Sequence, residues 1–333
     1  MHLSRRFKKN GVHSDEEIQE HKSTPPVFTE EERYELVKAI KWVDDVVEAA
    51  PYVTTLKTLE ENNCQYCAHG NDITTTADGF DTYQRVKDAN RYLEVERTQG
   101  VSTTDLLKRM IKVSKLQNDR DNNNNKLEDS QEPNHQFQEK LPKVSSYTGN
   151  SKLILTTQKL LQFSENKKPK PGDKVIYVAG TFDVFNVGHL RFLKRAKQLG
   201  DYLIVGVYDD ETASLCHGPG YPIMTLNERA LSLLACKYVS DVVIGAPLVI
   251  SADLIDHLNV SVVALGFNGT SSHPVTNQDL YVVPREKHLF QVIDSGCPLT
   301  TQDLVARVGR LASQYEERNR KKEEKEAKII LAQ

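Results

Sequence analysis

The chain has 333 residues, 38% of them hydrophobic, which is enough to build cores for two domains of ordinary size. A formal net charge of -3 gives no basic excess and argues against a nucleic-acid partner. No apolar run reaches the roughly 18 residues of a membrane span, and the start is too polar for a secretory signal, so we expect a cytoplasmic protein with no membrane span.

Two blocks of mixed apolar and polar sequence, residues 1–115 and 174–312, are the expected domains. Residues 116–173 contain four consecutive asparagines and many Gln, Glu and Pro, and this composition buries too little apolar surface to offset chain entropy. We expect a largely disordered linker there, with one short apolar segment, residues 152–163, that can dock. Residues 313–333 alternate in charge, which predicts a solvated helical tail.

Five cysteines with no framework spacing indicate a reducing compartment. Cys64 and Cys67 form a C-x-x-C, but no second pair completes a zinc site. We therefore expect both to be small core residues, and no protein-held metal site is predicted.

The two blocks repeat each other at an offset of 195 to 196 residues. Gly11–Glu16 matches Gly206–Glu211, and Val43–Val47 matches Val239–Val243. The sequence is therefore interpreted as a tandem duplication.

The second copy shows what a whole unit contains. Residues 174–179 and 201–207 are expected to be buried strands, residues 180–186 a turn, and residues 187–199 an amphipathic helix, which together make the βαβ unit of a parallel sheet. Only ten residues precede Gly11, so the first strand, turn and helix have no counterpart in the first copy. Three explanations stay open: an incomplete gene model or alternative transcript, which we favour, a strand borrowed from elsewhere, or docking on the second copy.

The turn of the second copy is similar to the H-x-G-H signature of nucleotidyltransferases, which sets a triphosphate against free backbone N–H groups at a helix N-terminus. Asn186 stands in place of the first histidine and cannot become cationic. His189 is the candidate catalytic residue here. The candidate nucleotide-binding residues are Gly180, Phe182, Asp183, Asn186 and Gly188.

Residues 97–106 close the first block with a guanidinium, a glycine and three consecutive hydroxyl residues next to an expected helix start, which predicts a phosphate-binding segment. A plain Ser/Thr helix cap is the alternative. The candidate residues are Arg97, which is also a catalytic candidate, and Thr98, Gly100, Ser102, Thr103 and Thr104.

Residues 97–104 resemble the R-T-x-G-I/V-S-T-T signature of the CTP:phosphocholine and CTP:phosphoethanolamine cytidylyltransferases, and residues 42–47 resemble their W-V-D-E-V segment. The tandem arrangement is similar to the ethanolamine-phosphate cytidylyltransferases in particular. The resemblance implies two Rossmann-like α/β nucleotidyltransferase domains of the H-x-G-H superfamily, the first incomplete. It also implies formation of CDP-ethanolamine and pyrophosphate from CTP and phosphoethanolamine, with Mg2+, in phosphatidylethanolamine biosynthesis, and an expected homodimer.

The same resemblance implies further site residues in the first copy. Lys22 corresponds to a catalytic lysine that grips phosphate, although a lysine there can also be merely solvated. The implied substrate or nucleotide contacts are Trp42, Asp44, His69, Asn71 and Asp72.

Neither copy matches the whole pattern. In the second copy the lysine position falls near His217, and residues 294–301 replace the phosphate-binding segment without an arginine. Two hypotheses follow: an active cytidylyltransferase, or an inactive homologue that binds nucleotide or a full-length partner. A third, kinship with other nucleotidyltransferases or class I tRNA synthetases, is disfavoured because those families lack the R-T-x-G-V-S-T-T segment.

Overall fold

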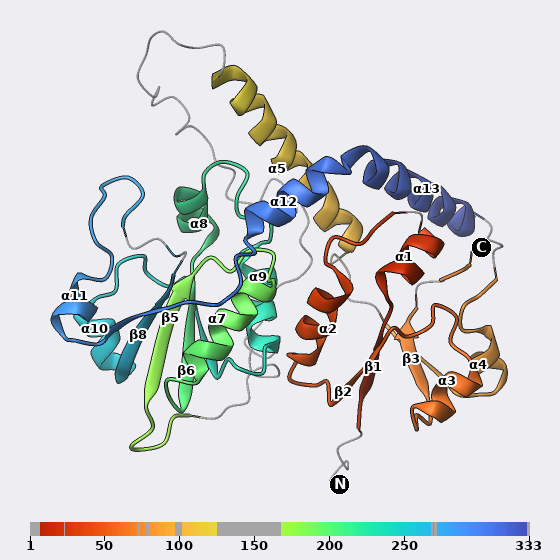
Figure 1. The fold of residues 1–333 in the computed structure, drawn as a ribbon, viewed down its shortest axis with the longest axis horizontal. Helices are drawn as coiled ribbons and strands as arrows, with labels where there is room; N and C mark the ends of the chain where they lie inside the picture. The colour runs from red at the N-terminus through yellow and green to blue at the C-terminus, as the bar shows by residue number, and fades with distance from the viewer. Residues whose placement is uncertain are drawn as a thin grey trace. The chain divides into compact units, whose positions relative to one another are not determined.

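The computed structural model describes residues 7–22, 24–71, 74–76, 80–96, 102–124, 168–267, 269 and 272–331 (Figure 1). The chain divides into two units. The first contains Met1–Val101 and Leu311–Gln333, and the second contains Ser102–Arg310.

The second unit is built on a five-stranded parallel sheet. Its strands are β5 (Val175–Gly180), β6 (Tyr202–Val207), β7 (Asp241–Ile244), β8 (Val260–Gly266) and β9 (Phe290–Ile293). Their order across the sheet is β7-β6-β5-β8-β9. The chain therefore moves in one direction from β5 to β7 and in the other from β8 to β9, and this reversal makes a switch point between β5 and β8.

The helices of this unit are α5 (Thr103–Asn124), α7 (Val187–Lys197), α8 (Asp210–His217), α9 (Leu226–Ala235), α10 (Ala252–His257), α11 (Val282–Glu286) and α12 (Thr301–Arg310) (Figure 1). α7, α9 and α10 pack on the sheet, and α5 packs on α12. The expected strand, turn, helix and strand are confirmed to within two residues, with α7 packed on both β5 and β6.

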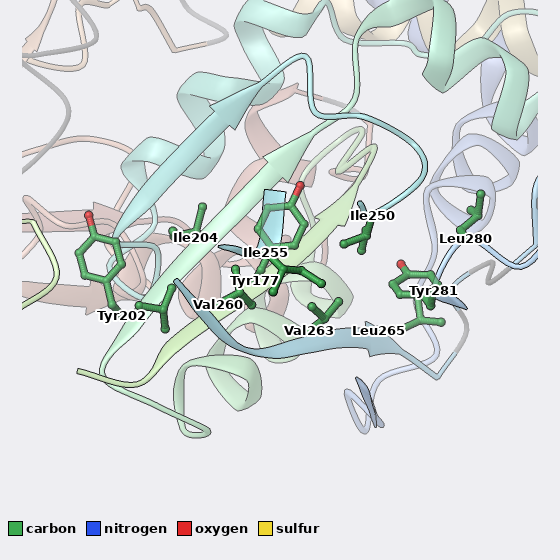
Figure 2. Close-up of a cluster of buried hydrophobic side chains, with 11 residues drawn as sticks. Tyr177, Tyr202, Ile204, Ile250, Ile255, Val260, Val263, Leu265, Leu280 and Tyr281 are labelled. Carbon is green, nitrogen blue, oxygen red and sulfur yellow. The ribbon is translucent and has the colours of Figure 1, made fainter. Parts of the chain in front are cut away.

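Central strands of this sheet are buried because helices lie on both of its faces. All four residues from Val175 to Val178 are buried. Figure 2 shows part of the core, in which Tyr177, Val263 and Ile204 come from the sheet and Ile255 comes from α10. This continuous burial explains why β5 is an unbroken run of β-branched and aromatic residues.

The first unit contains two separate pairs of parallel strands. Its elements are β1 (Lys9–Val12), α1 (Asp15–Lys22), α2 (Glu30–Lys38), β2 (Asp45–Glu48), α3 (Leu56–Glu61), β3 (Cys67–Gly70), α4 (Gln84–Asp88), β4 (Tyr92–Val95) and α13 (Ala312–Leu331). β1 pairs with β2, and β3 pairs with β4.

Strand register shows that the two units are copies of one design. Gly11 pairs with Val47 in β1 and β2, and Gly206 pairs with Val243 in β6 and β7. In the same way, β3 and β4 match β8 and β9. β5 lies between β6 and β8, and no strand in the described part of residues 7–96 corresponds to it.

An ion pair between an arginine and a partly exposed aspartate is also repeated. In the first unit Arg33 Nη1 lies 2.6 Å from Asp15 Oδ1, and in the second Arg229 Nη2 lies 2.7 Å from Asp210 Oδ1. Each pair joins the first helix after the equivalent strands β1 and β6 to the helix that follows it, α1 to α2 and α8 to α9. The duplication inferred from sequence is therefore present in side-chain contacts as well as in topology.

Two helices differ from the sequence expectation. α5 continues to Asn124, past residue 115 where the linker was expected to begin, and it is anchored in the second unit by buried Met110 and Val113. α13 is helical as expected, but its start is not solvated: Tyr315 is buried and its hydroxyl donates to the Pro25 carbonyl at 2.9 Å. The rest of the expected linker, residues 125–167, lies outside the described residues.

Candidate functional site

A cavity of about 270 Å³ opens in the second unit at the carboxyl ends of β5 and β8. Gly180 and Asp183 line it from the β5 side, and Leu265 and Phe267 from the β8 side. The cavity therefore lies at the switch point of the sheet, where ligands of open α/β folds bind.

The turn that follows β5 is strained and tightly held. Phe182 and Val184 have φ angles of 51° and 43°, a left-handed conformation that is costly for a β-branched residue such as Val184. Asp183, between them, accepts hydrogen bonds from the backbone N–H groups of Ile223 at 2.7 Å and Met224 at 2.9 Å. These bonds fix the cavity wall in a conformation that the turn would not adopt alone.

Asp183 is almost completely buried, and this decides its charge. Burial raises the pKa of Asp183 to about 6, against the opposing effect of the amide hydrogen bonds and of Arg229. The carboxylate is therefore ionised at neutral pH and gains a proton in mildly acidic solution.

The N-terminus of α7 is closed by Asn186. The Asn186 Oδ1 atom accepts hydrogen bonds from the backbone N–H groups of Gly188 at 2.9 Å and His189 at 3.3 Å. In return, the Asn186 N–H donates to His189 Nδ1 at 3.3 Å. The expectation of free amides for a triphosphate is wrong here, because asparagine is a strong N-cap residue and uses these donors itself.

His189 is half-buried and uncharged. Burial lowers its pKa to about 4, and the nearby His217 adds to this effect. Its ring lies 5.5 Å from that of Phe182 and 5.9 Å from that of Phe185, measured between centroids. At neutral pH His189 can form hydrogen bonds but carries no positive charge toward a ligand, and its catalytic role stays a prediction.

Gly188 is required by packing. A Cβ atom at this position would lie 2.4 Å from the Leu299 carbonyl oxygen, far inside van der Waals contact. The glycine of the G-H pair thus lets the segment before α12 approach α7, a reason that is independent of any ligand.

The counterpart of Lys22 in the second unit is His217. α1 and α8 have the same length, and these two residues end them at an offset of 195. His217 lines the cavity, its Nε2 atom lies 2.8 Å from Thr181 Oγ1, and burial lowers its pKa with help from Arg229. The correspondence expected from sequence is confirmed.

In the first unit Lys22 is exposed at the C-terminal end of α1. The preceding His21 stacks on the buried Tyr52 with ring centroids 4.1 Å apart, which fixes this end of the helix. Trp42 lies in the turn before β2 with 39% of its surface exposed, so it is not a core residue.

The other first-unit candidates occupy strand ends. Asp44 lies at the amino end of β2, and its Oδ2 atom accepts the Lys8 N–H at 2.9 Å. His69 and Asn71 lie instead at the carboxyl end of their strand. His69, near the carboxyl end of β3, stacks on Tyr83 with ring centroids 4.5 Å apart. Asn71 directly follows β3, and its N–H donates to the Val95 carbonyl at the end of β4 at 3.1 Å. His69 and Asn71 thus share one sheet edge, as a nucleotide contact requires.

Part of the predicted phosphate-binding segment lies outside the described residues, namely Arg97, Thr98 and Gly100, as does Asp72. Ser102 is described: its Oγ atom accepts the Asp105 N–H at 3.2 Å, so it caps α5. Thr103 is exposed and Thr104 is buried. Their phosphate contacts stay predictions.

The far wall of the cavity was missed by sequence reasoning. Tyr208, Tyr221 and Tyr281 all line it. Tyr208 directly follows β6, so the strand-end rule could have indicated it. Tyr221 lies between α8 and α9 and Tyr281 directly precedes α11, and neither carries a sequence signal of its position.

The described residues hold neither a metal-binding cluster nor a membrane-spanning helix. No group of three His, Cys, Asp or Glu side chains there could hold a metal ion. Cys64 and Cys67 are half-buried, so the expectation of core positions is wrong for both. None of the described helices is long and apolar enough to cross a membrane.

Comparison with known proteins gives the family. The family model described as Cytidylyltransferase-like matches residues 4–109 and 177–294. Ethanolamine-phosphate cytidylyltransferase of Mus musculus is 47% identical and aligns with 97% of this chain and 83% of its own. The chain belongs to the ethanolamine-phosphate cytidylyltransferase family.

Other members of this nucleotidyltransferase family agree. The Dictyostelium discoideum enzyme is 45% identical, and the alignment covers 96% of this chain and 88% of that enzyme. The Arabidopsis thaliana enzyme is 39% identical, and the alignment covers 96% of this chain and 77% of that enzyme. A solved structure, the lipopolysaccharide core biosynthesis protein of Thermoplasma volcanium GSS1, is 22% identical over 37% of this chain and 96% of its own, with a TM-score of 0.31. A TM-score at this level carries no argument.

Proposed function

We propose that this chain transfers the cytidylyl group of CTP to phosphoethanolamine, forming CDP-ethanolamine and pyrophosphate. The observation that carries the proposal is identity of 39% to 47% to ethanolamine-phosphate cytidylyltransferases over 96% to 97% of the chain. A phosphate oxygen of phosphoethanolamine forms a bond to the α-phosphorus of CTP. The bond from that phosphorus to the bridging oxygen breaks, and pyrophosphate leaves with the electron pair.

Catalysis of this kind consists mainly of positioning and of stabilising negative charge. We assign charge stabilisation to Lys22 and Arg97, and contacts with phosphate oxygens to the segment 98–104. His69, Asn71 and Asp72 are assigned to the nucleotide.

The amine end of the substrate needs a different surface. An aromatic face and a carboxylate are groups that bind an ammonium ion. Trp42 is partly exposed and Asp44 carries a carboxylate, but both precede β2, so their assignment rests on the family resemblance and not on the carboxyl edge of the sheet. We assign these two residues to phosphoethanolamine.

Mg2+ is assigned to the substrate and not to a protein cage. The described residues offer no cluster of three suitable ligands, and Mg2+ commonly binds nucleotide phosphates with few protein ligands. When bound it would neutralise the β- and γ-phosphates. The residues of this chain would hold and orient the phosphates around it.

We place the activity in phosphatidylethanolamine biosynthesis, in the cytoplasm, and in a homodimer. The support is that both substrates are water-soluble phosphates and that the relatives carry the same enzyme name. Sedimentation velocity of the purified chain would test the dimer.

The activity is tested with purified chain, Mg2+, CTP and radiolabelled phosphoethanolamine. We expect CDP-ethanolamine at about 1 per second or more, with a lower rate for phosphocholine at the same concentration. Product no faster than in a reaction without protein would overturn the proposal and leave an inactive homologue.

A further inference from the structure

The cavity of the second unit has no positive wall. Of the described residues that line it, none is lysine or arginine, one is an aspartate and two are histidines. Its surface is otherwise aromatic, aliphatic, hydroxyl and amide. A triphosphate site would need cations or free amide donors here.

The duplication shows which cations are missing. His217 stands where the first unit has Lys22, at the end of an equivalent helix. The first unit has Arg97 in the segment before α5. The equivalent segment of the second unit is residues 294–302, which lead into α12, and it contains neither lysine nor arginine. Both charged positions of the first copy are therefore neutral or acidic in the second.

Several donors near the cavity are used within the protein. Asn186 occupies two of the amides at the start of α7, those of Gly188 and His189. Hydroxyl groups of the cavity rim also donate internally: Ser295 to the Cys297 carbonyl at 2.8 Å, Thr300 to Asp303 Oδ2 at 2.6 Å, and Thr301 to the Asp183 carbonyl at 2.7 Å.

Charge on the wall opposes an anion further. Asp183 is ionised at neutral pH, and His189 and His217 are neutral because burial lowers the pKa of both. A polyanion entering the cavity would meet a carboxylate and no lysine or arginine among the described lining residues, since the nearby Arg229 is buried behind the wall and donates to the Thr181 carbonyl.

What the cavity does offer suits a neutral, flat and partly polar ligand. Phe182, Phe192 and Tyr221 provide ring faces for stacking, while Thr181 and Gln302 provide polar groups at the edge. A volume of about 270 Å³ and a position at the switch point match a base with its sugar.

We propose that this cavity binds an uncharged nucleoside and discriminates against its di- and triphosphates. The choice of cytosine as the base rests on the proposed function, whereas the preference for an uncharged ligand does not. The second unit would then sense the nucleoside, and the first would bind the triphosphate.

Two cysteines make the proposal testable within the wild-type chain. Cys216 and Cys297 line the cavity, and Cys64 and Cys67 of the first unit serve as internal controls. The experiment measures iodoacetamide labelling of each cysteine by mass spectrometry with cytidine, CMP or CTP. Cytidine at ten times its Kd should slow labelling of Cys297 about tenfold while Cys64 is unchanged.

The order of protection decides the outcome. We expect cytidine to protect Cys216 and Cys297 at lower concentration than CMP, and CMP at lower concentration than CTP. Protection by CTP at lower concentration than cytidine, or no protection by millimolar cytidine, would overturn the proposal. Because product formation is measured separately, failure here is distinguishable from failure of the proposed activity.

A charge-restoring variant sharpens the test. His217→Lys places a cation where the first unit has Lys22. We expect the CTP concentration that protects Cys216 and Cys297 to fall about tenfold or more. The protecting concentration of cytidine should change less than about threefold. His217→Gln is the matched neutral control and should keep the wild-type order. A His217→Lys variant that folds normally and still prefers cytidine by the wild-type ratio would contradict the role of missing charge.

Discussion

Asn186 determines what the start of α7 can bind. A histidine at a helix start can offer a cation and leave amide donors free, but the asparagine side chain is short enough to accept both donors itself. The side chain is fully buried, so water does not compete for it. One residue thus converts a potential anion site into a closed helix cap.

Asp183 gives the second unit a pH dependence of known sign. Its folded pKa of about 6 lies above the ordinary value of 3.8, so between these values the folded state binds the proton that the unfolded state has lost. This stabilisation is complete below about pH 4 and is lost as pH rises to about 6. The free energy of unfolding should fall across this range by on the order of 2–3 kcal/mol from this residue.

Urea unfolding at pH 4 to 7 for wild type and Asp183→Asn measures the contribution. We expect the wild-type free energy of unfolding to fall relative to that of the variant as pH rises, and the difference to level off above pH 7. Parallel curves for the two proteins would mean that Asp183 already ionises near pH 4 in the fold. The 13C chemical shift of its carboxyl group gives an independent reading if the variant folds poorly.

Residue-level prediction succeeded where the repeat supplied a second copy to compare. The match of Lys22 to His217 needed only a constant offset. The Asn186 cap is local, and the N-cap preference of asparagine could have indicated it. The contact of Gly188 with Leu299 was not predictable, because it depends on how a distant segment approaches α7. Motif spacing carries no information about such approaches.

At the scale of elements, α5 is joined to the second unit by a buried ion pair. Arg109 Nη1 and Nη2 each lie 2.8 Å from an oxygen of Glu228, and Arg109 also donates to the Ile223 carbonyl at 2.7 Å. Burial by itself would raise the pKa of Glu228, but the hydrogen bonds and charge of Arg109 hold it below its usual value. The same carboxylate caps α9 through the Thr225 N–H at 2.8 Å.

Breaking this pair from one side should be costly. Arg109→Met leaves Glu228 buried without its partner, and we expect the free energy of unfolding to fall by about 3–5 kcal/mol. Arg109→Met with Glu228→Gln should cost less than the single change, since no charge stays buried. Lys287→Met, at the exposed pair with Asp256, is the control and should change stability by less than about 0.5 kcal/mol.

Urea denaturation of the four proteins at one pH gives these values. A double variant less stable than Arg109→Met by several kcal/mol would show that Glu228 acts mainly as a cap of α9 and not as the partner of Arg109.

Strands and the helix between them were predictable because each has a strong local pattern. Residues 174–207 contain two buried runs separated by an amphipathic helix, and the structure has these elements within two residues. The end of α5 was not predictable from composition, because Gln117 donates to the Tyr221 hydroxyl at 3.0 Å and so orders a polar stretch by a distant contact. Tyr315 is a similar case, since its burial depends on Pro25.

For the molecule as a whole, duplication allows the two copies to take different tasks. The second copy has a complete sheet and a cavity, but neutral or acidic residues at the cation positions. The first copy has Lys22 and the R-T-Q-G-V-S-T-T segment. The fold is therefore most complete in one copy and the charge needed for phosphate chemistry is concentrated in the other.

This division predicts where a single charge matters most. Lys22→Ala removes a cation that we assign to the triphosphate, and kcat/KM for CDP-ethanolamine formation should fall about a hundredfold or more, with Lys22→Arg retaining part of the activity. Lys57→Ala, in the exposed pair with Glu61 on α3, is the matched control and should leave kcat/KM unchanged within about twofold. Initial rates over a range of CTP concentrations separate kcat from KM. If Lys22→Ala kept more than half of the wild-type kcat/KM, the phosphate chemistry would have to depend on other cations of the chain, and the assignment of triphosphate binding to the first copy would lose its main support.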